Sequence, residues 1–280
     1  MTPPEHRAEG AGPFTTRLAW HRPEGQTVVW ESRPARKRGT LTVRGPGGTV
    51  AMSTSADAES LARLRKLNSI ASGAFFLGGL LFALGAGVAQ FGSGDPVESA
   101  SIYFAGGLFF NLGGYTSLLQ VLNAPRHSEG GGSLATTGWR WWGYEPMRLD
   151  WLSTFVLFTG TLVFGVNLLD SFLQGLTVQQ INRLIWTPDV IGCVLFLISG
   201  HLAMAEICHR SRPCLHSRSL GWWVVAVNQF GSVLFMVSAV AAFTRPSTQS
   251  LVNTDIANWG TLCGALCFAL GGVLQAFERP

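Results

Sequence analysis

Charged residues are scarce in this chain of 280 residues, and they are unevenly distributed. Asp, Glu, Lys and Arg make up 13% of the sequence, whereas soluble domains carry about 25%. Eleven of the twenty basic residues lie in residues 1–67, and long stretches of the remainder contain no Asp, Glu, Lys, Arg or His. This distribution excludes an ordinary soluble protein for most of the chain.

Five of the stretches without ionisable residues are long enough to cross a membrane. A helix needs about 20 apolar residues to span roughly 30 Å of hydrocarbon. A sixth stretch, Val190–Ala205, is interrupted only by His201, so we expect six transmembrane helices. The five uninterrupted stretches are Leu67–Gly94, Ser99–Pro125, Trp151–Leu169, Ser219–Thr244 and Ile256–Phe277.

A hydrophobic leader is also missing from the first 60 residues, so the first spanning helix is expected to direct membrane insertion. The five cysteines are an odd number, and three of them fall inside the predicted spans. Without a secretory signal this pattern indicates reduced thiols rather than a disulfide framework.

The basic residues of the connections predict an orientation. Ten lie on one side: Arg63, Arg65 and Lys66 just before the first span, Arg279 after the last one, and six in the second and fourth connections. Only Arg183 and Arg245 lie in the other connections. By the positive-inside rule both termini are cytoplasmic, and we expect the plasma membrane. The net charge of +4 is then explained by arginine facing anionic headgroups, so membrane lipids are expected partners and nucleic acid is not.

Residues 1–67 are predicted to form a basic, partly disordered cytoplasmic region. Residues 1–25 are rich in proline, glycine and arginine, which favours disorder. Thr27–Glu31 and Thr40–Val43 are β-prone and predict a small hairpin. The basic tract Arg33–Gly39 between them is interpreted as a solvated turn near the membrane.

One nine-residue phrase occurs three times, as GGLFFNLGG, GCVLFLISG and GALCFALGG. Its first Gly, its Phe and its last Gly are four residues apart, so they share one helix face, and small residues at this spacing let helices approach closely in lipid. We interpret the phrase as repeat packing. Its residues are Gly106, Phe110, Gly114, Gly192, Phe196, Gly200, Gly264, Phe268 and Gly272.

The phrase lies in every second predicted helix, which indicates three pseudo-repeated helical hairpins in one orientation. The other helices carry a weaker echo, at Ser72/Phe76, Thr154/Phe158 and Gly231/Phe235. The predicted fold class is therefore an all-α membrane protein of six spans. Its parts are hairpins at 68–123, 151–208 and 220–280, an aromatic cytoplasmic cap at 124–150 and a basic cytoplasmic loop at 209–219.

Four phrases, WWGYEPMRLDW, WTPDVIGCVLFLISG, NQFGSVLFMVSAVAAF and NWGTLCGALCFALGG, lie between Gly106 and Glu278. In these the chain resembles a group of bacterial and fungal integral membrane proteins, and its helix pairs are similar to the two-helix YrhK-like module. The resemblance implies six helices in repeated hairpins. It implies no activity, substrate or site.

Ionisable and amide residues inside a span are candidates for function, because burying them in lipid is costly. His201 lies in the inner half of the fourth helix, and Asn228 and Gln229 lie at a similar depth in the fifth. Glu206 can extend this cluster toward the cytoplasm, and Asn111 in the second helix can join it. Such a path could relay a proton or bind a polar solute, although His201 could equally lock two helices together with one hydrogen bond.

The segment before the third helix is the other place for chemistry. It concentrates aromatic, basic and acidic residues at the expected headgroup level, where it could contact lipid. The residues of this interfacial cap are Trp141, Trp142, Tyr144, Glu145, Arg148 and Asp150.

No nucleotide-binding, nucleophile or zinc-protease motif is found, so an enzyme is disfavoured, and no metal or cofactor is expected. We therefore predict a transporter or pore for a small solute or proton. A non-transporting membrane scaffold or sensor is the alternative, with a homo-oligomer or another membrane protein as partner. A lipid-acting enzyme is third.

Overall fold

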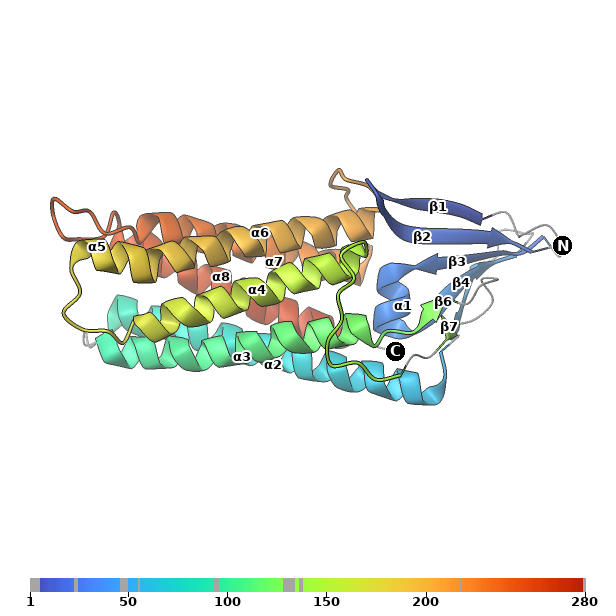
Figure 1. Cartoon of the computed structure of the whole chain (residues 1–280), viewed down its shortest axis with the longest axis horizontal. Coiled ribbons are helices and arrows are strands. Elements are labelled where there is room, and N and C mark those ends of the chain that lie inside the picture. Colours follow the sequence, from blue (N-terminus) through green and yellow to red (C-terminus); the bar gives the residue numbers. More distant parts are fainter. Residues whose placement is uncertain are drawn as a thin grey trace.

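The computed structural model describes residues 6–22, 25–45, 50–54, 56–92, 96–127, 134–135, 138–216 and 218–278. It combines an N-terminal β-sheet with a bundle of long helices, and the sheet lies at one end of the bundle (Figure 1). A pair of two-residue strands, β6 (Arg126–His127) and β7 (Leu134–Ala135), lies near the sheet.

The N-terminal region forms a five-stranded antiparallel sheet in which each strand pairs with the next along the chain. Thr16, Leu18 and Trp20 alternate with more exposed neighbours in the second strand and are buried, which is the period of a half-buried strand. The predictions of an all-α fold and of disorder in residues 1–25 are therefore wrong over residues 6–22. The strands are β1 (His6–Ala11), β2 (Phe14–His21), β3 (Thr27–Glu31), β4 (Thr40–Arg44) and β5 (Val50–Thr54).

The predicted hairpin is present, since β3 and β4 pair with each other. The basic tract between them is not a solvated turn, however, but the short helix α1 (Ser32–Arg38). Gly39 ends α1 with a φ of 63°, in the left-handed region that glycine adopts without a steric cost. Arg36, Lys37 and Arg38 occupy its last turn, where basic side chains complement the helix dipole.

Five helical segments are long and apolar enough to cross a membrane, by length and composition, among the described residues. Helix α3 has 27 residues and is not one of the five. Helix α6 continues from α5 (Val178–Gln180) and a π-helical segment, η1 (Ile181–Trp186). The long helices are α2 (Ala58–Phe91), α3 (Pro96–Leu122), α4 (Leu149–Asp170), α6 (Thr187–Cys208), α7 (Leu220–Ala241) and α8 (Thr254–Phe277).

The long helices pack as a closed ring. Helix α2 packs on α3, α4 on α6, and α7 on α8, and these pairs are joined by contacts of α3 with α4, α6 with α7, and α8 with α2. The last contact joins the first and last helices of the chain, so the ring has no open side. Figure 1 shows the helices running roughly side by side away from the sheet.

Within each helix pair, glycine and phenylalanine contact each other reciprocally. Every long helix has a Gly four residues before a Phe, and each Gly lies against the Phe of its partner. A Cβ atom at the Gly would come within 2.5–3.1 Å of the opposing ring, so a larger residue would force that ring to move, and Gly allows the close approach. The contacts are Gly78 with Phe110 and Gly106 with Phe82, Gly160 with Phe196 and Gly192 with Phe164, and Gly231 with Phe268 and Gly264 with Phe235.

The last glycine of each phrase faces the next helix pair instead. Gly114 contacts α4 and Gly272 contacts α2, in each case at a phenylalanine, whereas Gly200 contacts Gln229 of α7. The predicted echoes at Ser72/Phe76 and Thr154/Phe158 are therefore not the residues that contact the partner helix. Those residues are Gly78/Phe82 and Gly160/Phe164, six positions further along each helix. Phe76 and Phe158 serve the contacts between pairs.

Replacing Gly272 by Ala should destabilise the bundle. The added Cβ would lie 2.8 Å from two backbone atoms of α2, the nitrogen of Phe76 and the oxygen of Ser72, and a helix backbone cannot move as a side chain can. We expect a loss of about 1–3 kcal/mol in the free energy of unfolding, measured by unfolding in mixed detergent micelles. Gly87→Ala is the control, because no atom lies within 4 Å of its added Cβ. Equal stability of the two variants would contradict the close α8–α2 contact.

Candidate functional site

Helix α1 lies at the junction between the sheet and the bundle (Figure 1), and it carries buried charged side chains. Ser32, Arg36 and Lys37 are at most 6% exposed, although charged side chains are almost never fully buried unless they are paired. The pairing of β3 with β4 holds α1 at this position. The partners of its side chains come from the ends of the long helices.

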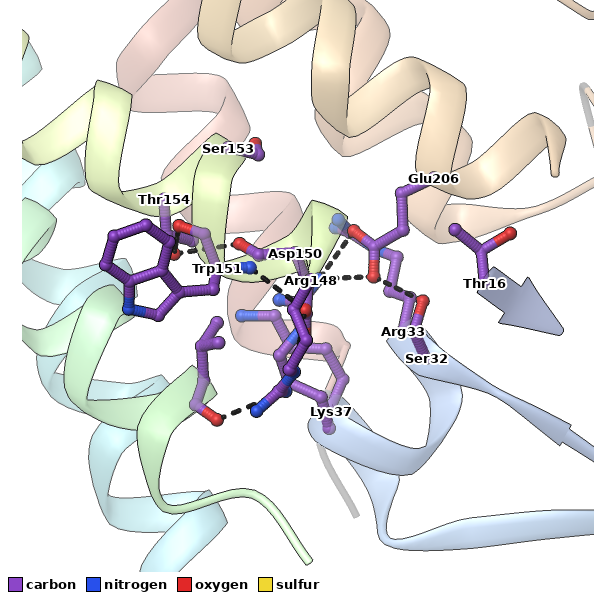
Figure 2. A network of polar contacts seen from close by, with 12 residues as sticks. Thr16, Ser32, Arg33, Lys37, Arg148, Asp150, Trp151, Ser153, Thr154 and Glu206 are labelled. Atoms are coloured by element: carbon purple, nitrogen blue, oxygen red, sulfur yellow. Dashed lines mark hydrogen bonds and ion pairs between the residues drawn. The ribbon is translucent and has the colours of Figure 1, made fainter. Parts of the chain in front are cut away.

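Arg36 forms an ion pair with Glu206 near the end of α6. Its Nη2 lies 2.8 Å from Oε2 and 3.0 Å from Oε1 of Glu206, and the hydroxyl of Ser32 donates to Oε1 over 2.7 Å. Figure 2 shows the Glu206 carboxylate pointing from α6 toward Ser32. Glu206 is 1% exposed, so its charge is matched by α1 and not by water. Arg36 Nε also lies 3.8 Å from the carboxylate of Asp150 at the start of α4.

Arg33 forms a second ion pair, with Glu278 just after α8. Nε and Nη2 of Arg33 donate to the two carboxylate oxygens over 2.8 and 2.6 Å, the bidentate geometry that favours Arg over Lys. Burial by itself would raise the pKa of Glu278, but the attraction and hydrogen bonds of Arg33 outweigh it and lower the pKa. Burial likewise opposes the charge of Arg33, and Glu278 nevertheless raises the pKa of the guanidinium.

Lys37 is buried without an acidic partner. Its Nζ donates to the amide oxygens of Asn68 on α2, over 3.0 Å, and of Gln120 on α3, over 2.7 Å. Asn68 and Gln120 are themselves fully buried. Among the described residues, no carboxylate lies within ion-pair distance of Nζ. Burial, followed by repulsion from Arg36, lowers the pKa of Lys37 well below its usual range.

The interfacial cap holds a second ion network. Arg140 and Arg148 both contact Glu145, and Arg148 also binds Asp150 over 2.7 Å. Burial would raise the pKa of Glu145, but the hydrogen bonds of Arg140 and Arg148 lower it. The carboxylates of the cap are thus engaged in joining it to α3 and α4. Trp141, Trp142 and Tyr144 have large exposed surfaces, as side chains at a headgroup level would have.

An inner cavity of about 100 Å³ lies between α1 and the aromatic core of the ring. All six long helices contribute to its wall, and Arg33, Arg36 and Lys37 of α1 line its sheet-facing end. Three buried polar atoms of its lining have no hydrogen-bond partner: Nε of Arg36, Nε2 of Gln275 and Oδ1 of Asn228. Residues of the cavity wall therefore carry two unpaired donors and one unpaired acceptor.

An outer cavity of about 220 Å³ lies toward the opposite end of the ring, where Asn167, Asp189, Asn258 and Thr261 contribute polar groups. A gap of only about 10 Å³ separates the two cavities. It shares Phe196 with the inner cavity, and Phe82, Phe164 and Phe235 with the outer one. The three spaces therefore follow one another along the ring, and phenylalanine closes the passage between them.

The core phenylalanines form two layers of three. One layer comes from α2, α4 and α7, and the other from α3, α6 and α8. Ring centroids lie 5.0–5.3 Å apart within the helix pairs and 5.5–6.4 Å apart between them. The layers are Phe82, Phe164 and Phe235, and Phe110, Phe196 and Phe268.

The structure brings together only part of the predicted polar path. Glu206 and Asn228 line the inner cavity. Gln229 instead faces Gly200 of α6, in the position that Phe76 and Phe158 occupy in the other contacts between pairs. Asn111 lies beside Gly165, between α3 and α4.

His201 is exposed on the outside of the ring. The predicted cluster of His201, Asn228 and Gln229 is therefore wrong, because equal depth along two helices does not place side chains on the same face.

The prediction of reduced thiols fails in the basic loop, where Cys208 and Cys214 form a disulfide with a Cα–Cα distance of 5.6 Å. His216 is near them, with Nδ1 3.0 Å from the sulfur of Cys214. A thiolate is needed to ligate a metal, and the two sulfurs are bonded to each other, so these residues form no metal site in this state. Cys193, Cys263 and Cys267 are free thiols.

The main residues that the sequence did not reveal are Arg33, Arg36 and Lys37. A basic tract is usually solvated, and its surroundings gave no sign of burial. The acidic partners of these residues could have indicated the ion pairs. Glu206 and Glu278 stand alone at the ends of apolar helices, and each requires a cation if it is buried. Comparison of the chain with protein-family models, with curated proteins and with solved structures finds no match.

Replacing Glu206 by Gln should strongly destabilise the junction, because Arg36 would then be buried without its main counter-charge. We expect a loss of about 3–5 kcal/mol, and a smaller loss when Arg36 and Glu206 are both replaced by Met. Unfolding of the purified protein in detergent would measure both. Glu59→Gln is the control, because the Glu59 side chain is 81% exposed in its pair with Arg63. Equal losses in the single and double variants would show that Arg36 does not depend on Glu206.

The Arg33–Glu278 pair should make stability depend on acid pH. The pKa of Glu278 is lower in the folded state than its ordinary value of 4.5. Its contribution is therefore present above about pH 4.5 and is lost as the pH falls through the lowered folded value. The stability difference between the wild type and Glu278→Gln should shrink between about pH 7 and about pH 3. A difference that is constant over this range would contradict an ionised, paired Glu278.

Proposed function

We propose that this protein is an integral membrane transporter or pore for a small solute, with its path along the axis of the helix ring. The observation that carries this proposal is the series of an inner cavity, a phenylalanine constriction and an outer cavity inside one closed ring. Binding sites in membrane transporters commonly lie near the midplane between packed repeats. The polar groups that line both cavities would meet the solute.

The proposal treats α3 as a sixth span beside the five apolar helices, and the three helix pairs as repeated hairpins. The identical reciprocal Gly–Phe contacts in each pair support the repeat. The basic residues at the sheet end support cytoplasmic termini, and the proposal places the protein in the plasma membrane. The Cys208–Cys214 disulfide, at the same end, weighs against a reducing compartment. The proposal follows the arginine distribution for the orientation, because several connections share it, whereas the disulfide concerns one loop.

The phenylalanine layers act as the gate in this proposal. A dry constriction stops ions and polar solutes because they cannot shed their water there without new partners. Helix α1 closes the inner end, since its Arg33, Arg36 and Lys37 line the cavity between the sheet and the ring. Passage therefore requires movement both at the phenylalanines and at α1.

A non-transporting sensor or scaffold is the second candidate. It is favoured by the tight aromatic core, which leaves only about 10 Å³ between the cavities, and by the buried ion pairs that fasten the N-terminal sheet to the ring. In that case the sheet would be the signalling part, and the axis would stay closed.

Removing one phenylalanine ring from the constriction should connect the two cavities. In a cysteine-free background carrying Asn228→Cys in the inner cavity, Phe235→Ala should raise labelling by a membrane-impermeant thiol reagent, added at the end away from the sheet, by about tenfold or more. Phe230→Ala is the matched control, because Phe230 is 59% exposed on the outside of α7. Protection of Asn228→Cys from both sides in both backgrounds, in folded protein, would reject the axial path and leave the sensor or scaffold.

A further inference from the structure

The inner cavity is lined by one basic group more than its carboxylate partners can pair with. Arg33 is paired with Glu278, Arg36 with Glu206, and Arg148 with the nearby Asp150. Lys37 is the cation that remains, 3% exposed and held by two amide oxygens. An ammonium group in a low-dielectric site is costly without an anion nearby. The site is therefore built for a negative charge that the described side chains do not supply.

Unpaired hydrogen-bond donors of the cavity lining also favour a negatively charged occupant. Nε of Arg36 and Nε2 of Gln275 donate no hydrogen bond, on side chains that are 5% and 7% exposed, and the Asp150 carboxylate lies 3.8 Å from Nε of Arg36. Lys37 has three N–H donors, and within the described part of the chain two of them have partners. Such donors normally find partners when they are buried. An occupant that accepts hydrogen bonds on more than one side would satisfy them together.

The size of the cavity limits this occupant. On this measure a water molecule needs about 10–15 Å³, so the cavity of about 100 Å³ has room for an occupant larger than one water molecule. Chloride, nitrate, formate and bicarbonate fit this space. One uncompensated positive charge matches one negative charge.

We propose that the inner cavity binds a small monovalent anion, with Lys37 as its counter-charge and Arg36 and Gln275 as hydrogen-bond donors. This inference rests on the proposed function and deepens it, because it names the class of solute. Asn228 also lines the cavity, but its Oδ1 packs against Gly271 of α8. Phe75, Phe196 and Phe268 close the apolar side of the site.

Anion binding should be coupled to a proton on Lys37. The charged groups that act on Lys37 are Arg33 and Arg36 of its own helix, Glu206 of α6 and Glu278 after α8. In the empty site, burial and the two arginines hold the pKa of Lys37 low. A bound anion favours the ammonium form and raises the pKa. Binding therefore takes up protons between the two values, and the affinity falls as the pH rises through that window.

The test is anion binding by the purified full-length protein in nanodiscs, followed by calorimetry with sodium formate, chloride and nitrate. Ionic strength is kept constant with gluconate, which is much larger than the three test anions. We expect binding with proton uptake, seen as a dependence on the ionisation enthalpy of the buffer. Lys37→Met and Gln275→Leu should each weaken binding by about tenfold or more. Lys66→Met is the matched control, because Lys66 is exposed on α2.

Two results would overturn the proposal. One is the absence of binding for all three anions in folded wild-type protein. The other is binding that Lys37→Met and Gln275→Leu, shown by circular dichroism to be folded, both leave unchanged. Either result, together with thiol labelling of Asn228→Cys in the Phe235→Ala background, would reject the anion while leaving the axial path in place. If that labelling also fails, the axial path is rejected as well.

Discussion

The requirement that a buried charge meets an opposite charge governs how the two parts of this protein are joined. Helix α1 carries three basic side chains into the end of the ring, and the ends of α4, α6 and α8 supply carboxylates to meet them. Separating the parts would expose unpaired charges on both sides. The desolvation cost of such pairs is large, so they define one docked position more than they add stability. The position of the sheet is fixed in turn, because α1 connects its paired strands β3 and β4.

The ring depends on a second constraint, the absence of a hydrophobic force between helices in lipid. Close backbone approach and ring packing must hold the helices together instead. The reciprocal Gly–Phe contacts meet this requirement in each helix pair. They also place a phenylalanine from every long helix at the centre, which separates the inner from the outer cavity. The same contacts that close the ring thus divide its axis.

Sequence patterns predicted the parts of this structure that depend on local spacing. Gly106, Phe110, Gly192, Phe196, Gly264 and Phe268 all lie in close contacts between neighbouring helices, because residues four apart share a helix face whatever surrounds them. The sheet was partly missed, since its alternation is short and lies within a region rich in glycine and proline. His201 was placed wrongly because depth along a helix does not fix the direction of a side chain. The burial of Lys37 depends on Asn68 and Gln120, 31 and 83 residues away, and no local pattern contains that information.

Both constraints meet at Lys37. The ring supplies the neutral amides that hold it, the sheet supplies the helix that inserts it, and the cavity beside it contains the unused donors. Arg33 and Arg36 bind acidic groups on α6 and after α8, so their charges fix α1 in place. Lys37 has no such partner among the described residues, so an ammonium charge there would carry a penalty in the docked state that a bound anion would remove. In the proposed transporter, the occupancy of the cavity and the docking of the N-terminal sheet would therefore be linked through a single side chain. That link is reciprocal: an anion that stabilises the docked helix is itself bound more tightly when the helix is docked.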